Sequence, residues 1–250
     1  MNVAYSIMSI DDSRKEYKDA IRDNIKDYAE LINKIQYYDC RNDDEYEAAK
    51  ERFKRFEWHW TNPRRGHFGV WVSTLSALEY IANCPYDGVI IFEDDAFLHK
   101  DFDFLMRKYT PDLPEDWDFF SIHNPHNQNN DFYNEYNYTP DGSLAGGHRN
   151  YPAGAPGFLY GSDNLCRSFQ GYGACAIMYS PKGAEKLLSF FEQNGIKMSA
   201  DCHIFQASKS TWPHRINGYS VRPNKTKPAN VHLDAQTQIH NTEQIEDVNA

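Results

Sequence analysis

Three consecutive acidic residues, Glu93, Asp94 and Asp95, follow directly on the apolar run at residues 89–92 (VIIF). A short, continuous apolar run is typical of a strand buried in a parallel sheet, so we expect the three carboxylates at the end of such a strand. Carboxylates held this close together repel one another, and the repulsion raises their pKa values. A divalent cation removes this cost, because Mg²⁺ and Mn²⁺ prefer oxygen ligands and combine few protein carboxylates with substrate phosphates. The cluster therefore predicts a Mg²⁺ or Mn²⁺ site; the alternative is an acidic turn that only ends the strand.

The elements that would position these carboxylates alternate between apolar strands and amphipathic helices. This alternation predicts an α/β fold with a mixed, mostly parallel sheet and helices on both of its faces. In such sheets ligands bind beyond the carboxyl ends of the strands, which is where the acidic cluster is expected. The predicted strands lie near residues 2–10, 89–92, 117–123, 174–179 and 218–222, and the predicted helices near 17–35, 43–56, 66–82, 181–191 and 199–208.

One domain is expected over residues 1–222, followed by a polar C-terminal tail over residues 223–250. Within the domain, residues 124–172 are rich in Asn, Gly, Tyr, Pro and Asp and show little periodicity. A loop of this length inside a compact domain is usually functional. We therefore expect it to be an active-site loop.

The composition narrows the classes of protein. The chain has 250 residues and a formal net charge of −10, with 26 basic and 36 acidic residues. Proteins held to nucleic acid by bulk electrostatics are usually basic, so binding to nucleic acid would need a local basic patch. The five cysteines are odd in number and lack C-x-x-C spacing, which argues against a disulfide framework or a structural zinc site. The sequence has no signal-peptide pattern and no apolar run of about 18–20 residues, so we expect a cytoplasmic protein without a transmembrane segment.

Several short motifs occur in an order that resembles family 25 glycosyltransferases, which include lipopolysaccharide and collagen galactosyltransferases. Residues 66–73 (GHFGVWVS) are similar to the family pattern G-E-x-G-C-x-x-S-H, and residues 90–96 (IIFEDDA) carry its E-D-D. Gly66, Gly69 and Ser73 match the first pattern. His67, Val70 and Thr74 replace the usual Glu, Cys and His, which indicates a divergent branch.

Three further segments extend the resemblance over most of the first 205 residues. Residues 10–14 (IDDSR) look like a degraded form of the opening N-L-x-R-S-x-x-R. Residues 173–188 (GACAIMYSPKGAEKLL) are similar to G-Y-x-I-S-x-x-G-A-x-K-L-L, and residues 200–201 match the end of a later P-V-D. Each motif is weak alone, and their common order gives the resemblance its specificity.

The resemblance implies a GT-A fold, a nucleotide-sugar donor with a UDP-sugar as the first expectation, a Mn²⁺ or Mg²⁺ ion, and transfer with inversion. An inverting transfer needs one base that deprotonates the acceptor hydroxyl. The resemblance implies Asp95 as the metal ligand, with His232 completing the metal shell, Arg14, Ser73, Glu93 and Asp94 on the donor side, and Asp201 as the base.

Structural alternatives exist for three of these residues. Asp201 would otherwise be the N-cap of a helix over residues 202–208, and Arg14 would be a solvated helix arginine. His232 would be a polar surface histidine. His123 and His126 lie three residues apart, but the proline between them disfavours a helix and they have no third ligand at zinc spacing, so we do not predict a metal site there.

The sequence leaves the acceptor open. A glycan or glycolipid is the acceptor of most of the family, whereas a hydroxymethylated pyrimidine in DNA, of the kind bacterial viruses glycosylate, would suit two segments that mix basic and aromatic residues. These segments are residues 50–65 and 209–227, and the alternative for 50–56 is an amphipathic helix with a charged outer face. A non-catalytic carbohydrate-binding protein would keep the aromatic loop but would not need the acidic cluster.

Overall fold

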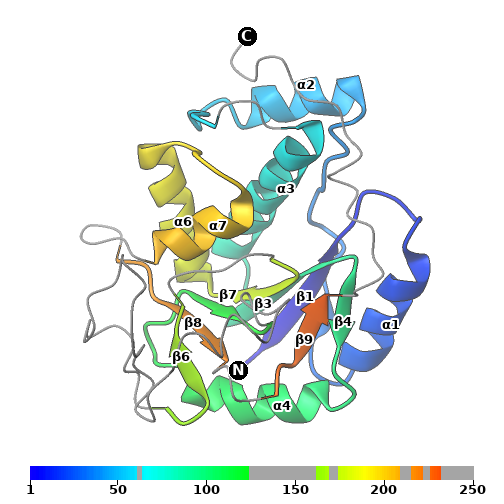
Figure 1. Ribbon diagram of the computed structural model, residues 1–250, viewed down its shortest axis with the longest axis vertical. Coiled ribbons are helices and arrows are strands. Elements are labelled where there is room, and N and C mark those ends of the chain that lie inside the picture. The colour runs from blue at the N-terminus through cyan, green and yellow to red at the C-terminus, as the bar shows by residue number, and fades with distance from the viewer. Residues whose placement is uncertain (61–63, 124–161, 169–173, 209–214, 222–225, 232–250) are drawn as a thin grey trace, which may run out of the picture.

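The structure is a computed structural model of the chain (Figure 1). It describes residues 1–60, 64–123, 162–168, 174–208, 215–221 and 226–231. None of the helices in these segments combines the length and the apolar character that a membrane span requires.

A seven-stranded mixed sheet forms the centre of the described part of the chain. The pairings of β1 with β2 and β3, and of β5 with β8, are parallel, whereas β7 runs antiparallel to β3 and β5, and β6 runs antiparallel to β8. Five of the seven strands therefore point the same way, which confirms the predicted α/β fold with a mixed, mostly parallel sheet. In spatial order the strands are β2 (Glu30–Leu31), β1 (Val3–Met8), β3 (Gly88–Glu93), β7 (Ala176–Tyr179), β5 (Phe119–Ser121), β8 (Gly218–Val221) and β6 (Leu165–Arg167).

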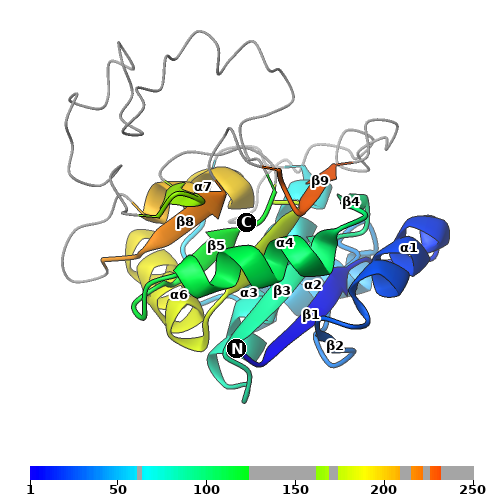
Figure 2. The same ribbon diagram turned by 90° about the horizontal axis from the view of Figure 1, so that it is seen from below.

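Helices cover both faces of this sheet because its central strands are apolar on both sides. Along β3, Val89 and Ile91 pack into one hydrophobic cluster, and Ile90 and Phe92 pack into the other. In Figure 2, α4 lies in front of the sheet and α3 and α6 lie behind it. The first cluster includes α2 (Asp43–Arg52), α3 (Arg65–Ala82), α6 (Pro181–Asn194) and α7 (Ala200–Ala207), and the second includes α1 (Lys15–Ile25) and α4 (Phe102–Tyr109), which continues into the 3-10 turn η1 (Thr110–Asp112).

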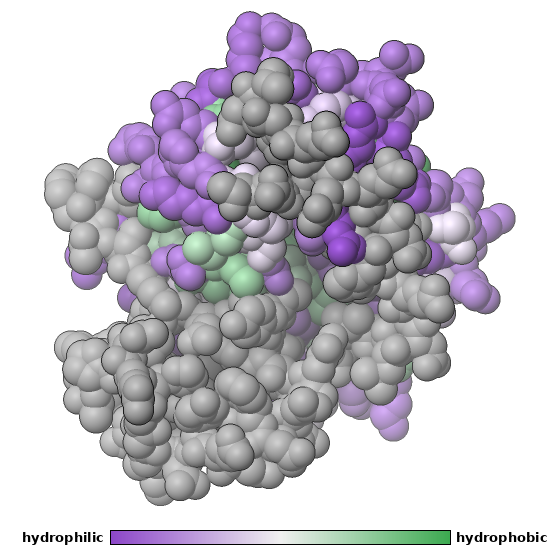
Figure 3. All heavy atoms as spheres, turned by 45° about the horizontal axis from the view of Figure 1, so that its top comes forward, coloured by the Kyte–Doolittle hydropathy of each residue, from purple (hydrophilic) through white to green (hydrophobic). Residues whose placement is uncertain are grey.

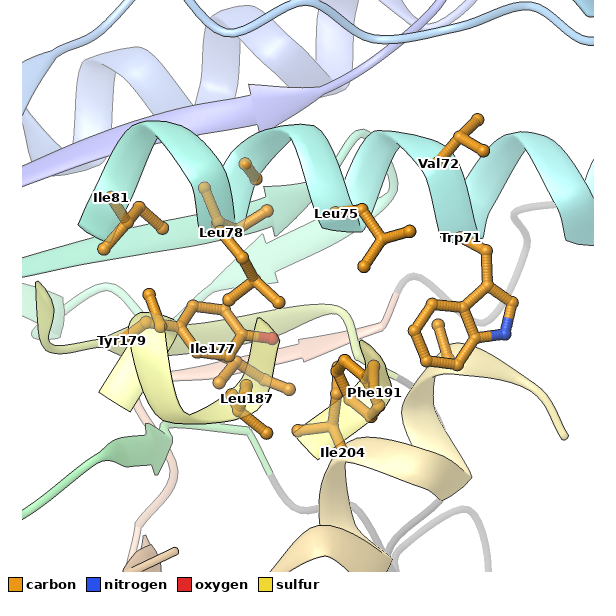
Figure 4. Packing of buried hydrophobic residues seen from close by; sticks show 14 of the residues in the cluster. Trp71, Val72, Leu75, Leu78, Ile81, Ile177, Tyr179, Leu187, Phe191 and Ile204 are labelled. Atoms are coloured by element: carbon orange, nitrogen blue, oxygen red, sulfur yellow. The ribbon is translucent and has the colours of Figure 1, made fainter. Parts of the chain in front are cut away.

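The α3 helix is the main packing element of the first face. Its Trp71, Leu75 and Leu78 are fully buried and point toward β7, α6 and α7 (Figure 4). The Trp71 ring meets the Phe191 ring edge to face at 5.0 Å, and its indole N–H donates to the Met198 carbonyl at 2.7 Å. This packing fixes α3 along the sheet, so that its amino-terminal half reaches the carboxyl end of β3.

The predicted long helix over residues 17–35 is wrong in its second half. The α1 helix ends at Ile25, and the chain then forms β2 on the edge of the sheet, where the Ile32 N–H donates to the Tyr5 carbonyl at 2.7 Å. Ile21 and Ile25 pack in the second cluster, whereas Ile32 and Ile35 pack in the first. The apolar spacing that predicts one helix therefore serves both faces of the sheet.

Two strands lie in segments predicted to be loop or tail. β6 lies within residues 124–172, so that part of the predicted active-site loop is a sheet strand; residues 124–161 and 169–173 lie outside the described residues. In the predicted tail, β9 (Ala229–Val231) pairs antiparallel with β4 (Ala96–Leu98), and the two strands lie side by side in Figures 1 and 2. The tail thus reaches the segment that follows the acidic cluster.

The helix predicted after residue 180 begins as its sequence indicates. The Ser180 side chain caps α6 by accepting from the Gly183 N–H at 2.9 Å, and Pro181 takes the first helical position. A Cβ at Gly183 would lie 1.9 Å from the Asp118 carbonyl oxygen. The missing side chain therefore allows α6 to dock against the start of β5.

Candidate active site at the carboxyl edge of the sheet

The sheet has a topological switch point between β1 and β3. The chain leaves β1 through α1 to form β2 on one side, and returns through α2 and α3 to form β3 on the other side of β1. Both pairings are parallel, and α1 and α3 pack on opposite faces of the sheet. Crevices at the carboxyl ends of strands that flank such a point are where open α/β sheets bind ligands.

The acidic cluster lies at this crevice, as the sequence predicts. Glu93 is the last residue of β3 and faces Met8 of β1 in register. Its backbone N–H donates to the Cys175 carbonyl at 2.9 Å, which ties the end of β3 to the start of β7. Asp94 and Asp95 form the turn into β4, and both are buried. The carboxylates are therefore held on a rigid strand end between two paired strands.

Arg14 reaches this turn from the residue immediately before α1. Its Nη1 donates to Asp94 Oδ1 at 2.7 Å and lies 3.2 Å from Asp95 Oδ2. Its side chain is 13% exposed, so the alternative of a solvated helix arginine is wrong. The repulsion that the sequence attributes to the acidic cluster is therefore relieved in part by an internal guanidinium.

Glu93 is half-buried, and its carboxyl group has a raised pKa. Burial, followed by the negative charges of Asp95, Asp201 and Asp94, raises the pKa of Glu93 to about 8, and Arg14 opposes this shift. Among the described residues, no side chain donates a hydrogen bond to its carboxyl group. In the absence of a bound cation, burial and the neighbouring carboxylates therefore favour the protonated form of Glu93.

Asp201 lies within electrostatic range of Glu93, although the two residues are far apart in the sequence. It belongs to the first turn of α7, whose N-cap is Ser199. The alternative of Asp201 as the N-cap is therefore wrong. The charge of the predicted base therefore acts on a predicted donor-binding carboxylate, although Asp201 is not among the residues that line the pocket described next.

A pocket that is open to solvent adjoins the acidic cluster. The end of β1, the segment 38–41, the amino-terminal half of α3 and the acidic turn form its walls. Four of the site residues predicted from the sequence, besides Arg14, line it. The lining residues are Met8, Ser9, Ile10, Arg14, Tyr38, Asp39, Cys40, Arg41, Gly66, Gly69, Val70, Ser73, Glu93, Asp94 and Asp95.

Ser73 and Gly69 shape the wall that α3 contributes. The buried Ser73 hydroxyl accepts a hydrogen bond from the Tyr38 N–H at 3.0 Å. A Cβ at Gly69 would lie 3.1 Å from the Tyr38 carbonyl oxygen. Both residues matched the family motif, and in the structure both hold segment 38–41 close against α3.

Three pocket residues had no signal in the sequence. Arg41 donates to both carboxylate oxygens of Asp39, at 2.7 and 2.8 Å, and to Asp11 Oδ2 at 3.2 Å. Cys40 is buried beside them, and burial raises the pKa of its thiol to about 12, so it is not a nucleophile at neutral pH. These residues lie in an irregular segment without a motif, and only the three-dimensional structure brings them to the site.

The side chains at the acidic turn can be compared with the ligands that the predicted Mg²⁺ or Mn²⁺ ion would need. Among the described residues, no three His, Cys, Asp or Glu side chains form a group that could hold a metal ion. Mg²⁺ and Mn²⁺ bind through one or two carboxylates together with substrate phosphates, and the acidic turn beside an open pocket fits that smaller requirement. His232 lies outside the described residues; the preceding residue, Val231, pairs with Ala96, which follows Asp95.

His123 is a core histidine. It is buried, and its Nδ1 lies 3.0 Å from the Ala176 carbonyl oxygen and 3.2 Å from Ser121 Oγ. His126 is outside the described residues, so the absence of a metal site here stays a prediction.

The basic and aromatic residues of segment 50–60 have structural roles. Phe53 and Phe56 are buried and cannot stack on bases. Arg52 and Arg55 each donate to Glu79 at 2.8 Å, and their guanidinium groups lie over the Phe53 and Phe56 rings. The surface over α2 is accordingly hydrophilic (Figure 3). The helix predicted over residues 43–56 ends at Arg52, and the turn that follows packs its aromatic rings into the core. Most of the second basic segment lies outside the described residues.

No protein-family model and no curated protein matches the sequence. The resemblance to family 25 glycosyltransferases therefore rests on the motifs quoted above.

Proposed function

We propose that this chain is a metal-dependent glycosyltransferase whose nucleotide-sugar donor binds in the pocket at the carboxyl ends of β1 and β3. One observation carries the proposal: an acidic turn whose Asp94 and Asp95 are bridged by Arg14 adjoins a solvent-open pocket at the switch point of the sheet, and the charge of Asp201 acts on Glu93. A purely structural acidic turn would not need an adjoining pocket or an additional carboxylate from a distant helix.

Different parts of the pocket wall would bind different parts of the donor. Apolar contacts from Met8, Ile10 and Val70 suit the nucleoside, and the Arg14 and Arg41 guanidinium groups suit the diphosphate. Asp95, supported by Asp94, would hold Mn²⁺ or Mg²⁺, and the bound cation would supply charge neutralisation for the departing diphosphate. Glu93 lies where it would accept hydrogen bonds from the hydroxyl groups of the ribose or the sugar.

The transfer replaces one bond at the anomeric carbon with another. The acceptor oxygen forms a bond to this carbon as the bond to the diphosphate oxygen breaks, and the nucleoside diphosphate leaves with that electron pair. The acceptor hydroxyl loses its proton to the Asp201 carboxylate, which acts as the general base. Glu93 is not proposed as the base, because burial and the neighbouring carboxylates favour its protonated form.

The acceptor is proposed to be a hydroxyl of a glycan or glycolipid. The sequence basis for a modified DNA base is the mixture of basic and aromatic residues in segments 50–65 and 209–227. In the first segment Arg52 and Arg55 are paired with Glu79, and Phe53 and Phe56 are buried; most of the second lies outside the described residues. DNA containing hydroxymethylated pyrimidines remains one arm of the acceptor test. Its binding would weaken steeply with added salt.

The first experiment is a donor-hydrolysis screen of purified protein. A panel of UDP-, GDP- and other nucleotide sugars is incubated with Mn²⁺ or Mg²⁺, and release of the nucleoside diphosphate is measured. We expect one donor class to be hydrolysed slowly, and Asp95→Asn to abolish the metal-dependent part of the rate. A chain that binds a sugar but hydrolyses no donor, and whose sugar binding survives Asp95→Asn, would be a carbohydrate-binding protein instead.

A further inference from the structure

The Arg14 guanidinium lies between the carboxylates that a cation would bind. Its Nη1 is 2.7 Å from Asp94 Oδ1 and 3.2 Å from Asp95 Oδ2, and the three side chains are 13%, 11% and 6% exposed. A guanidinium stays charged throughout the accessible pH range. In this structure Arg14 therefore provides part of the charge compensation that a divalent cation would provide.

The backbone at Arg14 is anchored, so that its side chain can move by rotation alone. The preceding loop is held at Asp11, whose carbonyl accepts from Ser9 Oγ at 2.9 Å and from Lys18 Nζ at 2.6 Å. The Lys15 N–H donates to the Asp12 carbonyl at 3.1 Å, which starts α1 directly after Arg14. A change of partner by Arg14 would not require the helix or the strand to move.

The charges around the pocket make such a change of partner favourable only when both ligands bind. Besides Glu93, whose protonated form is favoured, the pocket wall carries three carboxylates, those of Asp39, Asp94 and Asp95, against the two arginines. Arg41 is paired with Asp39 and Asp11. A diphosphate entering alone would meet an excess of negative charge, and a cation entering alone would have to displace Arg14 from two carboxylates.

We propose that Arg14 exchanges partners: it holds Asp94 and Asp95 in the empty site, and turns to the donor diphosphate once a divalent cation takes these carboxylates. The inference rests on the proposed function in that its ligand is a cation with a nucleoside diphosphate. Because each ligand removes an obstacle to the other, their binding is cooperative. Coupling between two ligands is reciprocal and typically amounts to about 5–150-fold in affinity.

The test compares Mn²⁺ binding with and without nucleotide. Free Mn²⁺ is measured by electron paramagnetic resonance for the wild-type chain, Arg14→Gln and Arg41→Gln, alone and with uridine diphosphate or, in a separate series, guanosine diphosphate. Protein-free titrations correct for the Mn²⁺–nucleotide complex. Arg41→Gln removes the same charge from the same pocket without touching Asp94 or Asp95, so it measures the general electrostatic effect.

In the wild-type chain, we expect one nucleotide to tighten Mn²⁺ binding by about 5–150-fold. In Arg14→Gln, Mn²⁺ alone should bind several-fold more tightly than in the wild type and in Arg41→Gln, and the enhancement by nucleotide should fall toward one. Arg14→Lys keeps the charge with a smaller, single-point donor, and should restore part of the enhancement. It also replaces the Gln variant if that variant does not fold.

Equal affinity of Arg14→Gln and Arg41→Gln for Mn²⁺ alone, or an undiminished nucleotide enhancement in Arg14→Gln, would overturn the exchange while leaving donor hydrolysis untouched. If the Mn²⁺ titrations support the exchange but no donor is hydrolysed, the pocket is a metal–nucleotide site and the glycosyltransferase proposal is wrong. If the wild-type chain binds no Mn²⁺ with either nucleotide, both proposals fall.

Discussion

Each edge of the sheet holds buried carboxyl groups, and the two edges differ in the hydrogen-bond and charge partners that these groups find in the protein. At the amino edge, Asp118 precedes β5 and is fully buried, and its oxygens accept from Lys186 Nζ at 2.8 and 2.7 Å and from the Asn217 N–H at 2.7 Å. At the carboxyl edge, the Arg14 guanidinium contacts two of three adjacent carboxyl groups, and the pKa of the third, Glu93, is raised by burial and by its negative neighbours. At the amino edge the protein itself supplies all the partners of the carboxylate. At the carboxyl edge, negative charge remains that a ligand could compensate.

This difference separates a structural role from a functional one. Burial raises the pKa of Asp118, and the hydrogen bonds from Lys186 and Asn217 oppose that rise, so the group is balanced by the fold. Perturbed carboxyl groups that lack such partners and face a pocket are typical of binding and catalytic sites. Removing a carboxylate should therefore lower stability at the amino edge and activity at the carboxyl edge.

The largest effect is expected from Asp201→Asn. Loss of a general base lowers transfer by about 10²–10⁴-fold, whereas stability should change little because Asp201 is only partly buried in the first turn of α7. The measurement is transfer from the donor found in the hydrolysis screen, together with thermal unfolding. A variant that transfers at the wild-type rate would remove Asp201 from the catalytic machinery.

At the other edge, Asp118→Asn should destabilise the protein by about 2–4 kcal/mol, because Lys186 would lose its counter-charge, and the partial exposure of the lysine moderates the cost. Chemical denaturation measures the loss of unfolding free energy. The double variant Asp118→Asn/Lys186→Met should recover part of it, since no unpaired charge then remains. If Asp118→Asn is as stable as the wild type, the proposed difference between the two edges of the sheet is wrong.

Local patterns in the sequence predict much of this fold. The apolar run of β3, the amphipathic spacing of α3 and the Ser180–Pro181 start of α6 each depend on neighbours along the chain, and each element forms where predicted. The helix predicted over residues 17–35 fails because periodicity does not reveal which face of a sheet a residue will meet. Ile25 and Ile32 continue one pattern but pack on opposite faces.

The candidate site is predictable only in part for a related reason. The acidic triplet is contiguous and follows a strand, so its position at the carboxyl edge follows from the sequence. The Arg14 ion pairs and the approach of Asp201 to Glu93 join residues far apart in the chain. Arg41 and Asp39 lie in an irregular segment, where neither spacing nor a motif indicates that they line a pocket.

Removing a buried polar group usually lowers the stability of a protein, whereas Glu93→Gln should raise it at high pH. The pKa of Glu93 is about 8 in the folded chain, above its ordinary value of 4.5. Its contribution to stability is therefore complete below about pH 4.5 and is lost as the pH rises through 8. Compared with the wild type, Glu93→Gln should gain up to about 4 kcal/mol on going from pH 5 to pH 9, because the titration of Glu93 is removed. Denaturant midpoints at pH 5, 7 and 9 measure this gain, and parallel curves for the two proteins would contradict the assignment.

The smallest effect is expected from Ser73→Ala, and it distinguishes a wall residue from a residue that binds the donor. Loss of the acceptor for the buried Tyr38 N–H should lower stability by about 1 kcal/mol. Ser76→Ala makes the same chemical change at a buried position of α3 that does not line the pocket, so it reports any general effect on the helix. If Ser73 acts only by fixing segment 38–41, its variant should raise the KM for the donor a few-fold without a change in kcat, because segment 38–41 shapes the binding wall and does not contact the reacting atoms. A fall in kcat for Ser73→Ala but not for Ser76→Ala would instead place the Ser73 hydroxyl in contact with the donor, as the motif resemblance implies.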